Sequence, residues 1–303
     1  MKHPTAFSAF SHQVQAPGVA QGMRLSGKQW LPEQTRASTD IPLIIAIHGG
    51  TYTSEYFDVP EHSLLERAAA LGIPVIAIDR PGYGWSTALA PAEATIARNA
   101  EVLDAAIGEI WAVSGQGTSG IILIGHSIGG AVVTMIASRN PTWPLLGIAI
   151  SGCLLEVPAA SRDKWAELPD VPLIDLPHVI KDSVMFGPAW THSDGAPEAS
   201  HVAHAACPRA ELIDITTAWP AHARSVAAKV TVPVHFRQGE FDALWITDRA
   251  QVEQFGAAFS ASPQVDAQLI PSSGHCIDFH RMGPGFQLEQ LAFALRCAVK
   301  REP

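Results

Sequence analysis

A serine flanked by glycines is the first feature of this sequence that could do chemistry. Residues 125–129 read Gly-His-Ser-Ile-Gly and match the pattern G-x-S-x-G, in which the serine is a nucleophile. An apolar run at 120–124 precedes this motif, and small and apolar residues follow it at 130–137. A strand, a sharp turn and a helix would place the Ser127 hydroxyl at the end of a sheet, beside the first amides of the helix. The sequence therefore predicts a serine nucleophile at position 127.

A serine hydroxyl needs a base that removes its proton and an acid that orients the base. His275 comes after a strand-like run at 265–270 and follows small residues that would let its loop approach the serine. Asp242 follows another strand-like run at 232–236. We predict His275 as the base and Asp242 as the acid, because loops at one edge of a parallel sheet can converge.

Three other carboxylates compete with Asp242 for the role of the acid. Glu240 lies closer to the end of the same strand, Asp248 is placed to cap a helix, and Glu156 follows a strand-like run at 146–150. The mechanism would work with any of these carboxylates, and only the residue assigned as the acid would change.

Three other histidines lie near these motifs. His280 falls in the predicted loop or first turn before the last helix, which favours His275 as the base. His48 stands at a strand end and is expected to brace its loop through a backbone hydrogen bond. The side chain of His126 should point away from Ser127, so we expect it to have a packing role.

Two backbone amides are expected to stabilise the negative charge that develops on a substrate oxygen. One is the amide of Ile128, directly after the serine. The other should come from the sequence His-Gly-Gly-Thr at 48–51, where glycines let the main chain approach a substrate carbonyl. Gly50 is the first choice for this second donor and Thr51 the alternative.

Composition and charge narrow the class of protein. The chain has 303 residues, of which 47% are hydrophobic and 16% charged, which indicates a globular protein with a large apolar core. The net charge is −9 and no basic cluster occurs, which argues against a nucleic-acid or anionic-membrane partner and favours a small-molecule substrate.

The sequence shows no sign of secretion or of a membrane span. The first ten residues lack the apolar stretch of a signal peptide, and no other window is long and apolar enough to cross a bilayer. Four cysteines, at positions 153, 207, 276 and 297, show no C-x-x-C spacing. We therefore expect a cytoplasmic protein with reduced thiols.

Strand-like and helix-like segments alternate along the chain, which predicts an α/β protein with a mostly parallel sheet. The predicted strands are short apolar runs at 43–47, 75–78, 121–124, 146–150, 232–236 and 265–270. Helices are predicted at 61–71, 91–113, 128–138, 248–261 and 284–300. Residues 23–31 would add one or two antiparallel edge strands.

The alternation stops in the middle of the chain, at residues 153–229, where prolines are frequent. We interpret this stretch as an inserted lid between core parts at 1–152 and 230–303; the alternative is a helical pad that only stabilises the domain. Large apolar side chains in and near it would line a substrate pocket, or else form the lid's own small core. They are Trp165, Met185, Phe186, Trp190, Trp219 and Trp245.

One pattern in the predicted lid has the spacing of metal ligands. His201, His204 and Cys207 recur every three residues and could bind zinc from one face of a helix. No fourth ligand is evident, so we favour an ordinary polar helix and predict no metal.

The motifs together resemble those of the α/β-hydrolase superfamily, in particular its members with a lid. The resemblance rests on the serine motif, on His-Gly-Gly at 48–50 and on residues 79–86, which are similar to the segment D-x-x-G-x-G-x-S of that superfamily. It covers residues 41–300 except the lid. It implies an α/β-hydrolase fold and, because the nucleophile is serine and not aspartate, an acyl-enzyme. Many relatives have Pro-Gly soon after His-Gly, where this chain has Thr-Tyr-Thr at 51–53.

These observations predict an enzyme that hydrolyses a medium-sized, largely apolar ester or lactone without a cofactor. Two other functions remain open. A carbon–carbon bond hydrolase or lyase could use the same residues with the serine as a proton relay, and a receptor-like protein could bind a small molecule with little turnover.

Overall fold

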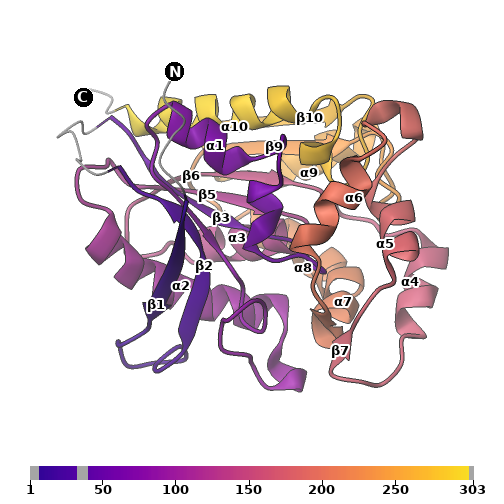
Figure 1. The fold of residues 1–303 in the computed structure, drawn as a ribbon, viewed down its shortest axis with the longest axis horizontal. Helices are drawn as coiled ribbons and strands as arrows, with labels where there is room; N and C mark the ends of the chain where they lie inside the picture. Colours follow the sequence, from indigo (N-terminus) through magenta and orange to yellow (C-terminus); the bar gives the residue numbers. More distant parts are fainter. Residues whose placement is uncertain (1–6, 33–39, 300–303) are drawn as a thin grey trace.

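A computed structural model describes residues 7–32 and 40–299 of the protein. Its centre is an eight-stranded sheet with the order β1-β2-β4-β3-β5-β6-β9-β10 (Figure 1). The first two strands run antiparallel, β2 is antiparallel to β4, and all pairs from β4 to β10 are parallel. The strands are β1 (Ser8–Gln13), β2 (Arg24–Trp30), β3 (Leu43–Ile47), β4 (Val75–Ile78), β5 (Ile121–His126), β6 (Leu145–Ser151), β9 (Val234–Gly239) and β10 (Val265–Ile270).

All six predicted apolar runs form strands of this sheet. Strand β5 extends beyond its predicted end to His126, and β9 continues to Gly239, so both strands reach the predicted catalytic loops. Of the edge strands, β2 was predicted, whereas β1 was missed. Four of its six residues are exposed or half-buried polar side chains, and it is recognisable only through its pairing with β2.

The central strands are buried on both faces, because helices cover each side of the sheet. In β3, Leu43, Ile45 and Ile47 belong to one hydrophobic cluster, whereas Ile44 and Ala46 belong to another. The first cluster includes residues of α2 and α3, and the second includes residues of α1 and α10. A strand covered in this way needs apolar residues at every position, which explains why the runs did not alternate with polar residues.

The two helical layers are seen in Figure 1, with α1 and α10 above the sheet and α2 below it. The helices next to the sheet are α1 (Leu64–Ala70), α2 (Ile96–Ser114), α3 (Ile128–Ser138), α8 (Ala218–Ala227), α9 (Arg249–Ala258) and α10 (Gly283–Ala298). Short 3₁₀ helices lie at Ser54–Asp58, Pro91–Glu93, Ala189–Thr191, His201–Ala203 and Ile277–Phe279.

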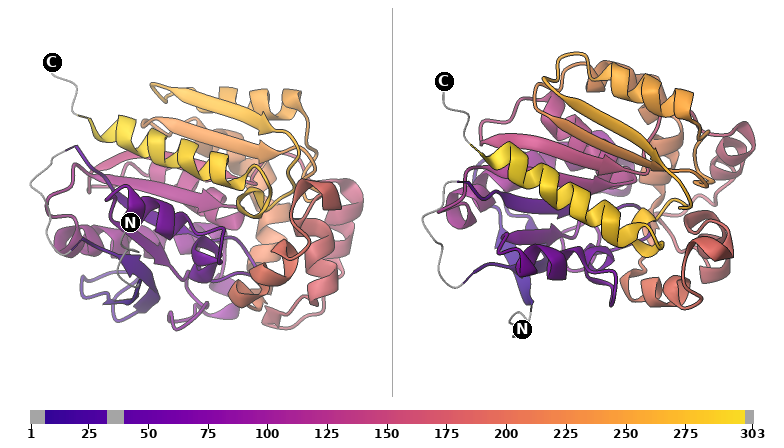
Figure 2. Two further views of the ribbon diagram at one scale, coloured as in Figure 1. Left: turned by 45° about the horizontal axis from the view of Figure 1, so that its top comes forward. Right: turned by 90° about the horizontal axis from the view of Figure 1, so that it is seen from above.

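A mainly helical region is inserted between β6 and β9. It contains α4 (Ala159–Ala166), α5 (His178–Met185), α6 (Ala196–Ser200), α7 (Arg209–Thr216) and α8. Two very short antiparallel strands, β7 (Leu173–Ile174) and β8 (Cys207–Pro208), were not predicted. Figure 2 shows that most of this region gathers at the end of the sheet to which the parallel strands point. The last helix, α8, leaves this group and packs against α3 and α9.

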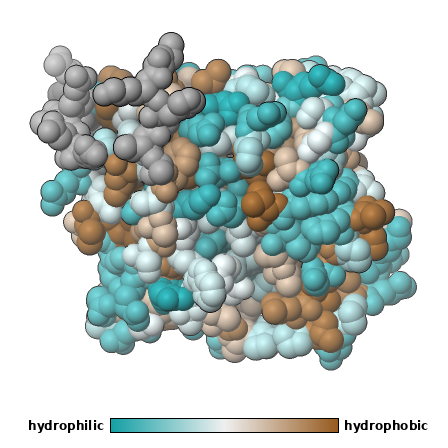
Figure 3. Space-filling model, viewed as in Figure 1, coloured by the Kyte–Doolittle hydropathy of each residue, from teal (hydrophilic) through white to brown (hydrophobic). Residues whose placement is uncertain are grey.

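The surface seen in Figure 3 is mixed, with hydrophobic residues in small groups among hydrophilic ones. Within the described ranges, no helix has both the length and the apolar character needed to cross a bilayer.

Candidate active site

Ser127 lies on the sharp turn between β5 and α3. Its backbone has φ 55° and ψ −124°, a conformation that is strained for a residue with a side chain. The turn is cramped, since a Cβ at Gly129 would lie 2.2 Å from the carbonyl oxygen of Ile47. The Ser127 amide donates to the carbonyl of Ser151 at 2.8 Å, which ties the turn to the end of β6. These contacts hold the serine in the position that the motif predicted.

His275 and Asp242 form a buried hydrogen-bonded pair. The imidazole Nδ1–H donates to Asp242 Oδ2 at 2.7 Å, and the two side chains are 1% and 0% exposed. The same carboxylate accepts from Gln238 Nε2 at 2.6 Å and from the Leu244 amide at 2.9 Å. These donors orient the carboxylate, which in turn fixes the imidazole with its proton on Nδ1 and leaves Nε2 as the basic atom.

The edge of the His275 ring that carries Cε1 lies at the segment to which the serine turn is tied. A Cβ at Gly152 would be only 3.0 Å from Cε1 of His275, and Gly152 directly follows Ser151, whose carbonyl accepts from Ser127. The Nε2 atom of His275 is buried and has no hydrogen-bond partner within residues 7–32 and 40–299. The hydroxyl of Ser127 and this nitrogen are therefore near the same segment without being hydrogen-bonded to each other here.

The competing carboxylates have other positions and partners. Glu240 accepts from the amide of Ser272 at 2.9 Å, and Asp248 caps α9 by accepting from the Gln251 amide at 2.7 Å. Glu156 is exposed at the surface. Asp242 is thus the candidate acid that the fold brings to His275.

His48 has the bracing position that we expected. His126 packs in the interior, but its ring also lies 4.8 Å from that of His275, so it is closer to the candidate base than we expected. His48 donates from Nδ1 to the Gly49 carbonyl at 2.7 Å and accepts at Nε2 from the Arg80 amide at 3.0 Å. His126 stacks on the ring of Tyr56 with the centroids 4.6 Å apart. Burial lowers the pKa of both imidazoles well below the usual range, so both are neutral at pH 7.

His280, the alternative base, supports the loop that carries His275. Its Nδ1–H donates to the Cys276 carbonyl at 2.8 Å. Its Nε2 accepts from the amides of Gly274 at 2.9 Å and Gly187 at 3.3 Å. Because both amides point at Nε2, a proton on this atom would break both hydrogen bonds. Burial lowers the pKa of His280 to about 4.

We expect this histidine to make the fold sensitive to acid. Between the unfolded pKa of about 6.5 and the folded pKa of about 4, the unfolded chain binds a proton that the folded one does not, so stability falls as the pH is lowered. Between pH 7.5 and pH 5.0, the titration of His280 should lower the free energy of unfolding by about 2 kcal/mol. Urea unfolding of the wild type and of His280→Asn at both pH values measures it. Equal losses in the two proteins would contradict this assignment.

A buried ion pair supports the loop after β3, which contains residues 48–51. Arg80 donates from Nε to the His48 carbonyl at 3.0 Å and from one NH group to the Gly49 carbonyl at 3.2 Å. Its other NH group pairs at 2.8 Å with Glu211 of α7, and neither side chain of the pair is exposed. Burial alone would lower the pKa of Arg80, but the Glu211 carboxylate raises it above the usual value. The inserted region therefore contributes a charge that holds this loop.

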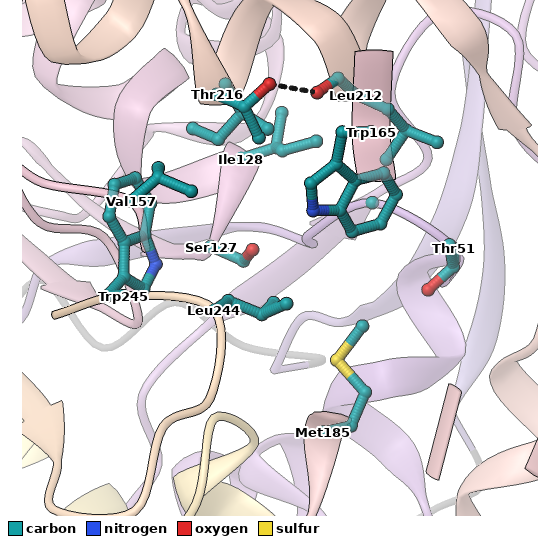
Figure 4. A pocket seen from close by; sticks show the side chains of 12 residues that line it. Thr51, Ser127, Ile128, Val157, Trp165, Met185, Leu212, Thr216, Leu244 and Trp245 are labelled. Carbon is teal, nitrogen blue, oxygen red and sulfur yellow. Dashed lines mark hydrogen bonds between the residues drawn. The ribbon is translucent and has the colours of Figure 1, made fainter. Parts of the chain in front are cut away.

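A pocket with a mostly apolar wall opens above Ser127 (Figure 4). In Figure 4 the serine hydroxyl points into the space between Trp165 and Trp245, with Met185 below them. None of the described residues that line it has a charged side chain. The lining residues are Gly50, Thr51, Ser127, Ile128, Val157, Trp165, Met185, Leu212, Ile215, Thr216, Leu244 and Trp245.

Three of the six predicted pocket residues do not line this pocket. Trp219 is buried in the core, where its indole donates to the Leu154 carbonyl at 2.9 Å. Trp190 is 59% exposed and packs on Phe241. Phe186 is buried against Phe279 and other rings near His280. All six were predicted because their side chains are large and apolar, but core residues have the same properties, so these properties do not distinguish the wall of a pocket from the core.

The sequence reasoning missed the contribution of α7 to the pocket. Leu212, Ile215 and Thr216 lie on one face of this helix at spacings of three and four residues. That spacing is the signal that could have located them.

The suggested zinc ligands are not brought together. His201 pairs with Asp182 at 2.9 Å and His204 with Asp175 at 2.8 Å. The thiol of Cys207 instead accepts from the Tyr83 hydroxyl at 3.0 Å. In the part of the chain that the structure describes, no group of three or more His, Cys, Asp or Glu side chains is arranged to hold a metal ion.

Comparisons with known proteins agree with this architecture. An esterase from Thermogutta terrifontis has a TM-score of 0.68 at 16% identity, over 96% of this chain and 100% of that chain. An E-2-(acetamidomethylene)succinate hydrolase has a TM-score of 0.67 at 16% identity, with the same coverage. An esterase from Exiguobacterium antarcticum has a TM-score of 0.64 at 15% identity, over 90% of this chain and 96% of that chain. At these identities the similarity shows a shared fold. No curated protein matches the sequence.

A family profile extends the similarity to the sequence itself. It is described as the alpha/beta hydrolase family and matches residues 44–283, which include the serine motif, the inserted region and the loops of Asp242 and His275. This match covers well over half of the chain and agrees with the eight-stranded, mostly parallel sheet and its inserted helices. The chain therefore belongs to the alpha/beta hydrolase family.

Proposed function

We propose that this hydrolase cleaves a medium-sized, largely apolar carboxylic ester or lactone through an acyl-enzyme on Ser127. The observation that carries the proposal is a serine on a strained turn that lines an apolar pocket, together with a buried imidazole, oriented by a carboxylate, at the segment to which that turn is tied. Residues in these roles make a serine reactive in unrelated folds.

In the first step, Nε2 of His275 takes the proton of the Ser127 hydroxyl while the oxygen attacks the substrate carbonyl. The hydroxyl and Nε2 must approach to hydrogen-bonding distance for this, and such contacts often tighten only when substrate binds. Asp242 stabilises the imidazolium that forms, since it already accepts from Nδ1. His275 then returns the proton to the leaving alcohol or to the ring oxygen of a lactone.

The negative oxygen of the tetrahedral intermediate is stabilised by the amides of Ile128 and Gly50. Ile128 is the first residue of α3, where an amide has no partner within the helix. A Cβ at Gly50 would lie 2.9 Å from the Ile128 side chain, so the two residues are in contact. Water activated by His275 then attacks the acyl-enzyme and releases the acid.

The lining of the pocket supports the proposed substrate class. Its wall is almost entirely apolar, and a pocket whose described wall residues carry no charge favours a neutral, apolar group. We also propose that residues 153–229 form a lid, because Trp165, Met185 and α7 contribute part of the wall above the serine. Two proteins of similar fold are described as esterases, which is consistent with this class.

Labelling with a fluorophosphonate, followed by a panel of esters and lactones, tests the proposal. We expect one phosphonyl adduct, located on Ser127 by mass spectrometry, and turnover of uncharged esters or lactones in preference to charged ones. A true substrate that is converted without any acyl adduct on Ser127 would favour the carbon–carbon bond hydrolase or lyase. Stable binding without turnover of any panel member would favour the receptor.

A further inference from the structure

His126, the residue directly before the nucleophile, lies against the candidate base. The centre of its ring is 4.8 Å from that of the His275 ring, and the two planes make an angle of 54°. Both side chains are buried, with 2% and 1% of their surface exposed. The mechanism proposed above gives His126 no task, although its ring is in contact with the group that takes the proton of Ser127.

A glycine lets the two rings come together. Gly152 has a φ of 63°, in the left-handed region that favours glycine. A Cβ at this position would lie 3.0 Å from Cε1 of His126 and 3.0 Å from Cε1 of His275. The two imidazoles therefore meet over the same residue, and a side chain there would push at least one of them away.

The orientation of the base depends on contacts of this kind. Within residues 7–32 and 40–299, the ring of His275 makes one hydrogen bond, from Nδ1 to Asp242 at 2.7 Å, and its Nε2 has no partner. One hydrogen bond at the edge of a ring leaves the ring some freedom to turn, whereas a packed neighbour restricts that rotation. Because Nε2 must face the Ser127 hydroxyl to accept its proton, this restriction bears directly on catalysis.

His126 can restrict its neighbour because it is itself held firmly. The ring of Tyr56 is stacked on it, with an angle of 9° between the planes. Tyr56 is completely buried, and its hydroxyl donates to Asp278 Oδ2 at 2.8 Å. Gln287 of α10 donates to the other oxygen of this carboxylate at 2.7 Å. The position of His126 is thus fixed by core residues, independently of the loop that carries His275.

The nitrogens of His126 lie between the two segments that form the site. Nδ1 is 3.2 Å from the hydroxyl of Ser151, whose carbonyl accepts from the Ser127 amide. Nε2 is 3.8 Å from the thiol of Cys276, the residue after His275. Burial lowers the pKa of His126 well below the usual range, so the ring carries no charge that would repel the imidazolium of His275.

We propose that His126 is a positioning residue, whose ring holds the imidazole of His275 in the orientation that accepts the proton of Ser127. His126 is not among the described residues that line the pocket, so it acts on the base and not on the substrate. The catalytic part of this inference rests on the proposed function.

Two substitutions of His126 separate its ring from its hydrogen bonds. Asparagine can place a polar atom near the Ser151 hydroxyl but lacks the outer part of the ring. We expect His126→Asn to lower kcat about 10- to 100-fold, because a small displacement of a reacting group is costly, and to change KM less than about threefold. His126→Phe keeps the ring and should retain kcat within about fivefold. If asparagine prevents folding, His126→Leu, which fills the volume without a planar ring, should show the same loss of kcat.

His235→Asn is the matched control. His235 of β9 is also a completely buried histidine that packs on an aromatic ring, that of Phe293 at 5.6 Å between the centroids. Both asparagine variants should unfold at lower urea concentration than the wild type, because each leaves space in the core. Only His126→Asn should lose kcat, which separates the contact with the base from the general cost of a cavity.

Proton NMR measures the state of the base without any substrate. The Nδ1 proton that His275 shares with Asp242 should give a signal far downfield, because it lies in a short, buried hydrogen bond to a carboxylate. Its absence in His275→Gln assigns it. We expect this signal to be retained in His126→Phe and His235→Asn, and to be broadened or lost in His126→Asn.

The outcomes separate this inference from the proposed function. If Ser127 labels with the fluorophosphonate but His126→Asn keeps kcat within about threefold, His126 does not position the base. The same conclusion follows if His126→Phe or His235→Asn loses as much kcat as His126→Asn. If the wild type neither labels nor cleaves any ester, the proposed function is wrong, and the NMR signal decides alone. An unchanged signal in His126→Asn would then overturn the inference, and a broadened or lost one would support it.

Discussion

Replacing Ser127 with alanine is expected to lower kcat by about 10⁴-fold or more, to the level that binding and the oxyanion donors alone can supply. KM should change only a few-fold, because the methyl group leaves the apolar walls intact. Among the residues that the structure describes, none forms a hydrogen bond with this hydroxyl, and the turn is held by the backbone contact with Ser151. Ser127→Ala should therefore unfold at nearly the same urea concentration as the wild type.

Steady-state kinetics on the best ester of the panel measure this effect, with Ser138→Ala as the control. Ser138 ends α3, where its hydroxyl donates to the Met135 carbonyl of its own helix, so this variant should have wild-type activity. If Ser127→Ala kept more than about 1% of kcat, the serine would not be the nucleophile, since loss of a nucleophile costs far more than 100-fold.

The largest loss of stability is expected for Glu211→Gln. Glutamine keeps the size of the side chain but removes the charge that balances Arg80, in a pair whose side chains are both fully buried. Removing one partner of such a pair costs about 3–5 kcal/mol, because the remaining charge is buried without compensation. Activity should fall as well, since Arg80 holds the carbonyls of His48 and Gly49 next to the proposed oxyanion site.

Urea unfolding at pH 7 measures this loss, and Glu101→Gln is the matched control. Glu101 pairs with Arg98 at 3.0 Å at the surface, where both side chains are about one third exposed, and such pairs contribute at most about 1 kcal/mol. Equal losses in the two variants would show that the buried pair does not hold the inserted region to the loop after β3.

The sequence was most informative where a local pattern is sufficient. Strand β3, at Leu43–Ile47, could be predicted because a strand buried on both faces must be apolar throughout. The position of Ser127 could be predicted because a strand, a cramped turn and a helix lie next to each other in the chain. Strand β1 could not, since its residues are largely polar and it forms only through its pairing with β2.

Other features depend on contacts between distant parts of the chain. Asp242, Glu240 and Asp248 were chemically equivalent candidates, and only the folded loops place Asp242 at the His275 ring. Trp165 and Trp219 are equally apolar, but one lines the pocket and the other is core. The reason is that α4, which carries Trp165, packs against α7 of the pocket wall, whereas α8, which carries Trp219, packs against α3.

The sequence by itself thus determined the sheet, the serine turn and the order of the candidate groups, because these follow from neighbouring residues and from the periodicity of apolar side chains. Only the tertiary structure decided the partner of His275, the walls of the pocket and the ion pair between Arg80 and Glu211. The physical reason is that hydrogen bonds and packing act over a few ångströms in space, between residues as far as 225 positions apart in the chain.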